Sequence, residues 1–353
     1  MGSTRSMRRR TGACVVALLA VLSACGGGGS SDEAGDERTG TDAEAGASGE
    51  AIKLGYSAWP GWFPLAVAEK QGLFEKAGVK VELVYFADYL SSLDAMAAGK
   101  LDGNTQTLND TLVSVSAGRN QQVVVVNDNS AGNDAIIVDK SIQKIADLKG
   151  KSVAAEQGVV DHFLLLQGLT QAGLSEKDID FRGLATDAAA AAFASGQFDA
   201  VGVFAPFTVE ALKRPGSHVL FDSADFPGSI PDFVVFDQDV VSQRRDDIQK
   251  IVDVWYETLD WIAENPDEAR AIMAEKAGLD VESYEGLEKG TRIFSAEEAL
   301  EAFMAKEAPV GLLAMAEQIN KFLLDTGLAK KPAPLDDLLE PSFTSDYLKR
   351  NGG

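Results

Sequence analysis

The chain has 353 residues, 45% of them hydrophobic, and a formal net charge of −22. A chain of this length can bury a large core without help from disulfide bonds. The acidic excess is spread along the sequence, which argues against nucleic acid as a partner because phosphate binding needs clustered Lys and Arg.

The N-terminus has the pattern of an export signal. Three arginines at 8–10 precede an apolar run over 13–22, which is too short to span a bilayer permanently. The run ends in the sequence LSAC, which resembles the lipobox of bacterial lipoproteins, with Cys25 as the lipidated residue. The alternative is an ordinary signal peptide with an incidental Cys25. We expect a signal peptide over 1–24 and an extracytoplasmic protein anchored to the cell membrane through Cys25.

Cysteine use limits the chemistry of the mature chain. Cys14 lies inside the expected signal, so Cys25 is the only cysteine left after cleavage. We therefore expect no disulfide, no thiolate metal cluster and no catalytic thiol. Residues 25–50 are mostly Gly, Ser, Asp, Glu, Thr and Ala, a composition typical of a flexible tether.

From residue 51 onward, β-branched runs alternate with helical patterns. We expect strands over 52–56, 79–86, 122–126, 152–155, 179–184, 200–203 and 233–236, and early helices over 64–71 and 88–99. This alternation predicts an α/β fold with open, mostly parallel sheets flanked by helices. Further helices are expected over 240–265, 267–277, 296–306 and 311–326, packing back on the sheets.

One sequence pattern occurs twice. Residues 98–103 read AGKLDG and residues 195–200 read SGQFDA, and each follows an Ala-Gly pair at nearly the same offset. Either the sequence pattern of a βαβ unit occurs twice by chance, or the chain contains two lobes of similar construction. We favour two lobes.

Ligands of open α/β sheets bind beyond the carboxyl ends of the strands, which turns the strand list into a list of candidate residues. Trp59 and Trp62 follow the first strand and could form an aromatic floor for a ligand, or cap the core. Thr107, Asn109 and Asp110 follow a further short strand that begins a few residues after Gly99, and Asn109 or Asp110 could instead cap a helix.

The remaining candidates follow later strands. Asn129 lies in the polar stretch after the strand over 122–126, and Glu156 and His162 lie at a strand-to-helix turn of the second lobe. Phe207 follows the strand over 200–203 and could close over a ligand or belong to the core. With two histidines and no zinc-binding spacing, no nucleophile elbow and no phosphate loop, we expect no metal and no cofactor.

Several of these segments together are familiar. GYSAWPGW at 55–62, AEKQGLF at 68–74, DLKGKSVA at 147–154 and the passage from Asp199 to APF at 205–207 resemble the substrate-binding proteins of the nitrate/sulfonate/taurine/bicarbonate group. The resemblance covers roughly 51–347. It implies a monomeric, two-lobed class II periplasmic-binding-protein fold that delivers a solute to an ABC importer, made of a permease and its ATPase.

The resemblance also implies how the chain divides. Lobe 1 would comprise 51–132 plus 236–353 and lobe 2 would comprise 133–235, with crossovers near 130–134 and 232–235. The family includes an enzyme branch that makes the thiamine pyrimidine and carries a cysteine-rich motif. The lack of cysteine after Cys25 favours a binding protein over an enzyme, and a sensory lipoprotein is a third possibility.

The charge of the expected cleft bears on the solute. The loops placed there carry Trp59 and several acidic residues, such as Asp110 and Glu156, but no Lys or Arg. An anion among unpaired carboxylates is costly. We expect a neutral or cationic nitrogenous solute, with a pyrimidine precursor or a zwitterion such as taurine as alternatives.

Overall fold

The computed structural model describes residues 49–351. The predicted signal peptide over 1–24, the lipid attachment at Cys25 and almost all of the predicted tether over 25–50 lie outside the described residues. Among the described helices, none combines the length and apolar character needed to span a bilayer.

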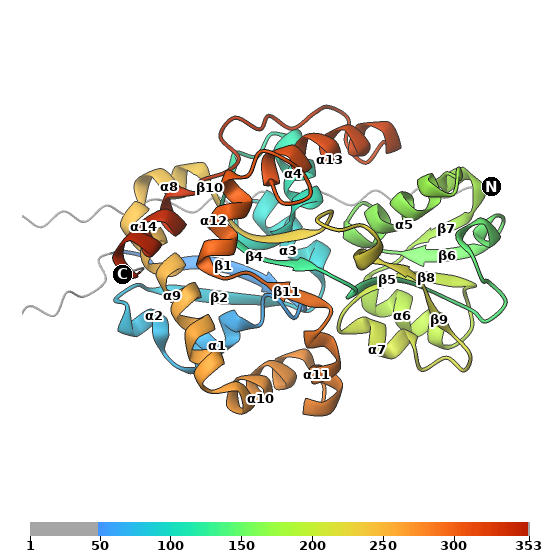
Figure 1. The fold of residues 1–353 in the computed structure, drawn as a ribbon, viewed down its shortest axis with the longest axis horizontal. Coiled ribbons are helices and arrows are strands. Elements are labelled where there is room, and N and C mark those ends of the chain that lie inside the picture. Colours follow the sequence, from blue (N-terminus) through green and yellow to red (C-terminus); the bar gives the residue numbers. More distant parts are fainter. Residues whose placement is uncertain (1–48, 352–353) are drawn as a thin grey trace, which may run out of the picture. The chain divides into compact units, whose positions relative to one another are not determined.

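Two mixed sheets form the framework of residues 49–351 (Figure 1). The six-stranded sheet has the order β11-β4-β10-β3-β1-β2, with β1 Ile52–Ser57, β2 Val81–Phe86, β3 Gly103–Thr107, β4 Gln121–Ser130, β10 Pro231–Asp237 and β11 Thr291–Ile293. The five-stranded sheet has the order β7-β6-β8-β5-β9, with β5 Asp134–Val138, β6 Ser152–Ala155, β7 Asp180–Gly183, β8 Ala200–Phe204 and β9 His218–Asp222.

Both sheets are mixed, whereas the sequence pattern predicted mostly parallel pairing. Strands β1, β2 and β3 pair in parallel, as do β6, β7 and β8. Strands β4, β10 and β11 add antiparallel pairs to the first sheet, and β5 and β9 add them to the second. The βαβ units give the parallel part, and the strands that carry the chain between the sheets give the antiparallel part.

Helices cover both sheets. Their bounds are α1 Pro64–Lys70, α2 Leu73–Lys76, α3 Tyr89–Ala97, α4 Leu108–Ala117, α5 Val160–Gln171, α6 Thr186–Ala194, α7 Phe207–Ala211, α8 Gln238–Gln243, α9 Arg245–Glu264, α10 Pro266–Ala277, α11 Val281–Glu288, α12 Ala296–Met304, α13 Leu312–Thr326 and α14 Ser342–Asn351. Short 3₁₀ turns occupy 145–148, 176–178 and 223–225. In the second sheet, α5 lies on one face and α6 and α7 on the other (Figure 1).

The repeated sequence pattern has the same structural role in both sheets. The backbone N–H of Lys53 at the start of β1 donates to Asp102 Oδ2 at 2.8 Å, just before β3. In the second sheet the N–H of Ser152 at the start of β6 donates to Asp199 Oδ2 at 2.9 Å, just before β8. Each aspartate thus fixes the start of a parallel strand pair, and the strand orders β2-β1-β3 and β7-β6-β8 match.

The chain passes between the sheets twice. The first passage joins Ser130 of β4 to Asp134 of β5, within the predicted 130–134. The second joins Asp222 of β9 to Pro231 of β10, upstream of the predicted 232–235. Residues 232–236 already pair with β3 and β4, so the return to the first sheet is complete before them. The assignment of whole segments to two lobes stays a prediction.

The C-terminal region is helical, with details that the sequence pattern missed. The predicted helix over 240–265 is broken at Arg244, where α8 ends and α9 begins. Ile251, Val254 and Trp255 of α9 are buried, as the amphipathic spacing predicted. Elements α11, β11 and α14 were not predicted, because they are short and owe their stability to packing on neighbours.

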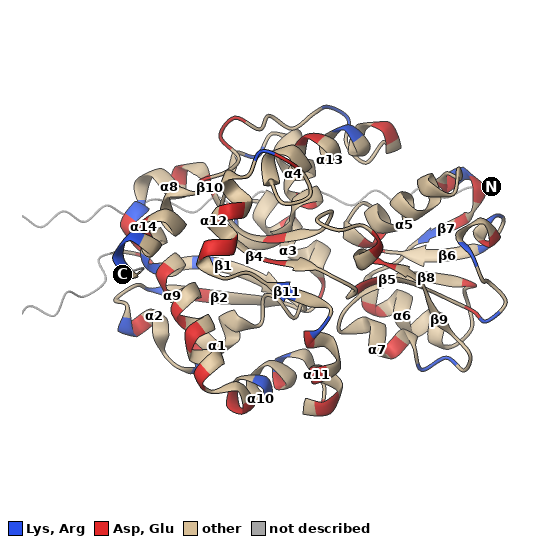
Figure 2. Ribbon diagram, viewed as in Figure 1, with Lys and Arg blue, Asp and Glu red and all other residues tan. Residues whose placement is uncertain are grey.

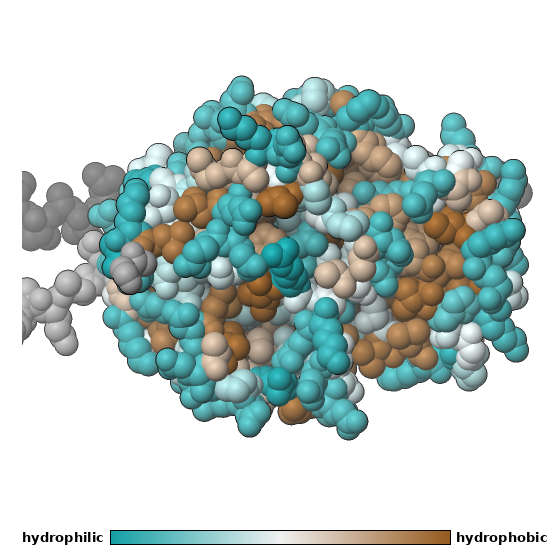
Figure 3. Space-filling model, in the orientation of Figure 1, coloured by the Kyte–Doolittle hydropathy of each residue, from teal (hydrophilic) through white to brown (hydrophobic). Residues whose placement is uncertain are grey.

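The space-filling view shows a mainly hydrophilic surface with scattered apolar patches (Figure 3). Large apolar side chains that are exposed come mostly from the C-terminal helices and their connections, such as Met304 and Val310. Isolated apolar residues of this kind are normal on a protein surface.

Candidate functional site

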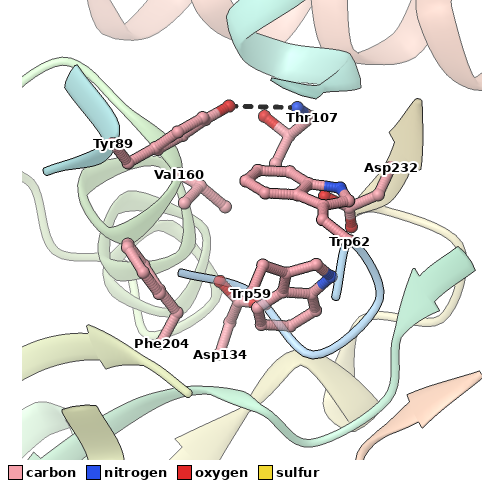
Figure 4. A pocket seen from close by; sticks show the side chains of 8 residues that line it. All are labelled: Trp59, Trp62, Tyr89, Thr107, Asp134, Val160, Phe204 and Asp232. Carbon is pink, nitrogen blue, oxygen red and sulfur yellow. Dashed lines mark hydrogen bonds between the residues drawn. The ribbon is translucent and has the colours of Figure 1, made fainter. Parts of the chain in front are cut away.

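A cavity lies where the two sheets meet (Figure 4). Its empty volume is about 230 Å³, and its lining comes from both sheets and their helices: Trp59, Trp62, Tyr89, Thr107, Asp134, Val160, Phe204 and Asp232. Small molecules bind preferentially in concave sites that have an apolar lining with a few polar groups. This cavity is therefore the candidate ligand site of the described residues.

Four aromatic rings line the cavity. The rings of Trp62 and Tyr89 have centroids 5.4 Å apart, and those of Tyr89 and Phe204 are 6.1 Å apart and nearly perpendicular. Trp59 meets Phe204 edge to face at 6.5 Å. Phe204 ends β8 of the second sheet, whereas the other three rings follow strands of the first. The aromatic wall is thus shared by the two sheets.

The loop after β1 presents the two tryptophans to the cavity. The backbone N–H of Trp62 donates to the carbonyl of Trp59 at 3.0 Å, so the loop folds into a tight turn through Pro60 and Gly61. Glycine is required at position 61 because the backbone there lies close to the side chain of Asp128. A Cβ at this position would lie 1.9 Å from Asp128 Oδ2. The turn therefore packs directly on a carboxylate of β4.

Asp128 and Asp232 form a buried pair of carboxyl groups. They lie opposite each other on the antiparallel strands β4 and β10, and both are 1% exposed or less. Trp59 Nε1 donates to Asp128 Oδ1 at 3.0 Å. Burial raises the pKa of both carboxyls well above the ordinary value, and the neighbouring Asp128 raises the pKa of Asp232 further. Such a pair favours holding a shared proton.

Asp110 lies in the first turn of α4 with both oxygens hydrogen-bonded. Thr107 Oγ1 lies 2.8 Å from Asp110 Oδ2, and Asn109 Nδ2 donates to Asp110 Oδ1 at 2.8 Å. Thr107 is the N-cap of α4, so neither Asn109 nor Asp110 caps it. Burial raises the pKa of Asp110 to about 7. Hydrogen bonds to Asp110 lower this pKa in part, and one of them comes from the backbone N–H of Val160 at the start of α5.

Further carboxylates face this region from the second sheet. Burial raises the pKa of Asp134, at the start of β5, to about 7. Thr186 Oγ1 lies 2.7 Å from Glu156 Oε2 and 2.9 Å from Asp161 Oδ2. Since one hydroxyl has one proton to donate, it cannot satisfy both carboxylates at once. Burial raises the pKa of Glu156 to about 7 and that of Asp161 well above its ordinary value.

The junction of the sheets is thus strongly acidic (Figure 2). Within residues 49–351, none of the ion pairs at 4.0 Å or less involves any of the six carboxylates, which are Asp110, Asp128, Asp134, Glu156, Asp161 and Asp232. Over the same residues, no group of three or more His, Cys, Asp or Glu has an arrangement that could hold a metal ion.

The structure brings only some of the predicted site residues to the cavity. Trp59, Trp62 and Thr107 line it, while Asn109 and Asp110 lie just behind Thr107. Glu156 lies close enough to Asp110 for the charge of Asp110 to raise its pKa.

The other three predicted residues lie elsewhere. His162 Nε2 is 2.7 Å from Glu176, and its ring stacks on Phe181 with centroids 4.4 Å apart. Asn129 belongs to β4, which continues through 127–130 where a loop was predicted, because β10 and β11 supply its pairing partners. Phe207 packs edge to face on Phe204 at 5.5 Å, one layer behind the cavity wall.

Five lining residues were not predicted: Tyr89, Asp134, Val160, Phe204 and Asp232. Asp134 and Asp232 did carry a signal, because each is a charged residue at the edge of an apolar run that reads as a buried strand. Tyr89 directly follows the helix cap Asp88, which was predicted correctly and accepts from the Ser91 N–H at 2.7 Å.

Comparison with known proteins identifies relatives that bind solutes. A Bacillus subtilis protein provisionally named an aliphatic sulfonates-binding protein is 26% identical over 78% of this chain and 81% of its own length. The taurine-binding periplasmic protein of Escherichia coli is 30% identical over 45% of this chain and 50% of its own.

Solved structures confirm the predicted fold class. The periplasmic aliphatic sulphonate binding protein SsuA of Escherichia coli matches with a TM-score of 0.66 and 25% identity, over 81% of this chain and 96% of its own. The desulfurization enzyme DszB has the same fold, with a TM-score of 0.58 and 18% identity over 85% of this chain and 99% of its own. The fold therefore serves binding proteins and at least one enzyme.

The family match agrees with the predicted resemblance to solute-binding proteins. It covers residues 45–278, which include both parallel strand units and all the lining residues of the cavity. With a periplasmic-binding-protein fold and a match over more than half of its length, this chain belongs to the NMT1-like family.

Proposed function

We propose that this protein is an extracytoplasmic solute-binding component that captures a small organic solute and delivers it to an ABC importer. The observation that carries the proposal is the cavity whose lining comes from both sheets. A solute held there touches both halves of the molecule and stabilises their closed arrangement, as in hinge closure around a ligand. The relatives, with names that describe binding of sulfonates and taurine, support this function.

The solute is small and either nitrogenous or zwitterionic. Trp59 and Trp62 supply aromatic surface, and Thr107 supplies a hydroxyl at the edge of the cavity. Asn109, Asp110 and Glu156 act from behind the lining. A pyrimidine precursor or a taurine-like zwitterion fits the aromatic lining as well as a simple amine does.

A melting screen tests the function. Amines, ureas, pyrimidines, sulfonates and oxyanions are added singly to the purified chain, and the unfolding midpoint is measured. At about 100-fold excess over Kd, a specific solute adds roughly 2.7 kcal/mol to the free energy of unfolding. Trp59→Ala is the matched control, since it should lose the shift that the wild type shows. If no compound stabilises the wild type, solute binding in this cavity is refuted.

The protein acts by binding, without turnover of its solute. The described residues 49–351 contain no cysteine, so a thiol nucleophile is not available to them. Long incubation of the identified solute with the protein, followed by mass spectrometry, should return the solute unchanged. Accumulation of a product in proportion to protein concentration would instead assign an enzyme of this fold.

Membrane attachment is a separate part of the proposal. The LSAC sequence ending in Cys25 supports a lipid anchor, and the acidic, Gly-rich segment over 25–50 supports a tether. Metabolic labelling with an alkyne fatty acid should mark the wild-type chain and leave Cys25→Ala unmarked. Equal labelling of both forms would contradict lipidation at this residue.

A further inference from the structure

Two lining carboxylates reach the cavity from different sheets, and each has an oxygen without a hydrogen-bond donor. Asp134 begins β5 and Asp232 lies in β10, and both are 1% exposed. Asp134 Oδ2 has no partner within the described part of the chain, and Asp232 Oδ2 has none there apart from the proton that Asp232 can share with Asp128. Buried carboxylate oxygens are normally hydrogen-bonded, so these two mark a place where donors belong.

A third unpartnered polar atom of the same lining is independent of the acidic residues. The indole Nε1 of Trp62 has no acceptor within the described residues. Because Trp62 is only 3% exposed, bulk water does not replace that acceptor. Trp62 Nε1 is a donor, and Asp232, when an occupant moves its carboxylate, can provide the acceptor (Figure 4). The cavity lining therefore has polar atoms that a ligand can reorganise.

The helix N-terminus at the cavity is poorly suited to an anion. Val160 is the first residue of α5, where free backbone N–H groups would ordinarily attract anionic ligands. Here the N–H of Val160 already acts on Asp110, lowering its pKa against the effect of burial. Asp161 follows in the same helix turn and Glu156 lies just before it. At least one N–H donor of α5, that of Val160, is thus already used by a carboxylate of the protein itself.

The aromatic wall suits a positive charge. Ring faces attract cations within about 6 Å of the ring centroid, and more strongly where water is excluded. Four rings that belong to two sheets surround the cavity, namely Trp59, Trp62, Tyr89 and Phe204. An organic cation could place its carbon atoms against these rings and its N–H groups against the two aspartates.

We propose that the solute is a small organic cation whose N–H groups bridge Asp134 of β5 and Asp232 of β10. This inference rests on the proposed solute-binding function and narrows its solute to one chemical class. The cation joins the two sheets directly, since one carboxylate comes from each. It also relieves the mutual repulsion of the buried carboxylates, which lack a cationic side chain.

The proposal fixes the sign of the proton linkage. The carboxylate of Asp222 in β9 acts on Asp134 and raises its pKa. Three carboxylates act on Asp232 in the same way, namely those of Asp128, Asp134 and Asp110. Glu156, Asp161 and the hydroxyl of Tyr89 complete the titratable groups around the cavity. Burial raises the pKa of Asp134 to about 7. A cation favours the ionised carboxylates, so its binding releases protons and strengthens as the pH rises.

Four probes with the same two-carbon chain separate the charge classes. Ethylammonium is a cation with N–H donors, N,N,N-trimethylethylammonium lacks those donors, ethanesulfonate is an anion, and taurine carries both charges. Each is titrated into the full chain by calorimetry at pH 5.5 and 7.5, in two buffers of different ionisation enthalpy. Ethylammonium should bind with release of about one proton, so its affinity should rise by up to about tenfold per pH unit and clearly more than tenfold between pH 5.5 and 7.5. Ethanesulfonate should give no heat of binding.

Matched variants locate the contact. Asp134→Asn and Asp232→Asn should each weaken ethylammonium binding at least tenfold and leave the chain folded, because they remove a buried charge. Asp325→Asn, on the exposed end of α13, should bind like the wild type. The proton linkage of the wild type tests the proposal even if a variant fails to fold.

The possible results are distinguishable. Binding of ethanesulfonate with proton uptake would overturn the cation inference and leave solute binding intact. Trimethylethylammonium binding as tightly as ethylammonium, or zinc or calcium ions displacing ethylammonium, would overturn the N–H bridge. If no probe binds and the melting screen is also negative, both the inference and the proposed function are wrong.

Discussion

Trp59 Nε1 donates to Asp128 Oδ1 at 3.0 Å, in a fully buried hydrogen bond that joins the loop after β1 to β4. The bond fixes the indole that forms one wall of the cavity. Within the described residues it is the only hydrogen bond to Asp128 from a side chain that is not itself a carboxyl, because the other partner of Asp128 is Asp232. Any movement of the Trp59 ring therefore also changes the hydrogen bonding of Asp128, and the reverse holds as well.

Substitution of Trp59 tests that coupling. Trp59→Ala should abolish measurable binding of the solute, because it removes the ring and the donor. Trp59→Phe keeps a ring but leaves Asp128 without a donor, and should weaken binding roughly tenfold, the equivalent of about 1.4 kcal/mol. Affinities are measured by calorimetry with the solute identified in the melting screen.

Trp255 provides the control for these variants. It is a buried tryptophan of α9 that does not line the cavity. Trp255→Phe should lower the unfolding midpoint and leave the affinity unchanged. An equal loss of affinity in Trp255→Phe and Trp59→Phe would show that general destabilisation causes both effects.

Gly61→Ala should damage the site through sterics alone. The added Cβ would lie 1.9 Å from Asp128 Oδ2 and 2.3 Å from its Cγ. Asp128 or the tryptophan loop must move, so the affinity should fall by at least tenfold. Gly286→Ala in α11 is the matched control, since its Cβ meets nothing within 4 Å and Ala is favoured over Gly in a helix by about 0.5–1 kcal/mol. Retained affinity in Gly61→Ala would contradict the close packing at this turn.

The solute-free protein should be more stable at pH 5 than at pH 8. Burial raises the pKa of Asp110, Asp134 and Glu156 to about 7 in the folded state, against 3.8, 3.8 and 4.5 as ordinary values. Between pH 4 and 7 the folded state therefore binds more protons than the unfolded state, so stability falls as the pH rises through this range.

Urea unfolding at several pH values measures this effect. Asp110→Asn should reduce the loss of stability between pH 5 and 8, because one of the contributing carboxyls is gone. A wild-type free energy of unfolding that increases from pH 5 to pH 8 would mean that these carboxylates are not buried as described.

His162 should be dispensable for binding. Its ring stacks on Phe181 and its Nε2 pairs with Glu176, outside the cavity lining. His162→Gln should lower the unfolding midpoint by a few degrees while the solute affinity stays within a factor of two. Burial lowers the pKa of His162, so this one residue opposes the carboxyls and its contribution to stability is lost as the pH falls below about 6.5. His162→Gln should therefore gain more stability than the wild type between pH 7 and pH 5. A large loss of affinity would restore His162 to the site.

The parts of the fold predicted from the sequence are those with short-range patterns. Strand β1, the helix that begins after Asp88 and the repeated pattern around Asp102 and Asp199 are all visible in short stretches of sequence, although the two aspartates bind residues 49 and 47 positions away. The antiparallel strands β5, β9 and β11 were missed because their pairing partners lie far away in sequence. For the same reason the polar residues 127–130 were predicted as a loop, although β10 and β11 hold them in a strand.

The same distinction applies to the candidate site. Trp59 and Trp62 were predictable because two large aromatic side chains in a Pro-Gly loop are unusual in water. Asp134 and Asp232 could not be placed together from the sequence, since they meet only through the packing of two sheets. His162 was misleading because a strand-to-helix turn positions some side chains toward the cavity and others, such as this one, toward the next strand.

The buried carboxylates also affect how the molecule migrates in an electric field. The formal charge of −22 counts every Asp and Glu as ionised, whereas burial favours a proton on the acidic side chains between the sheets. Near pH 6 the folded protein therefore has a lower electrophoretic mobility than its amino-acid content indicates. Unfolding in urea frees these protons, so a transverse urea gradient gel should show the extra negative charge as a displacement beyond that caused by expansion alone.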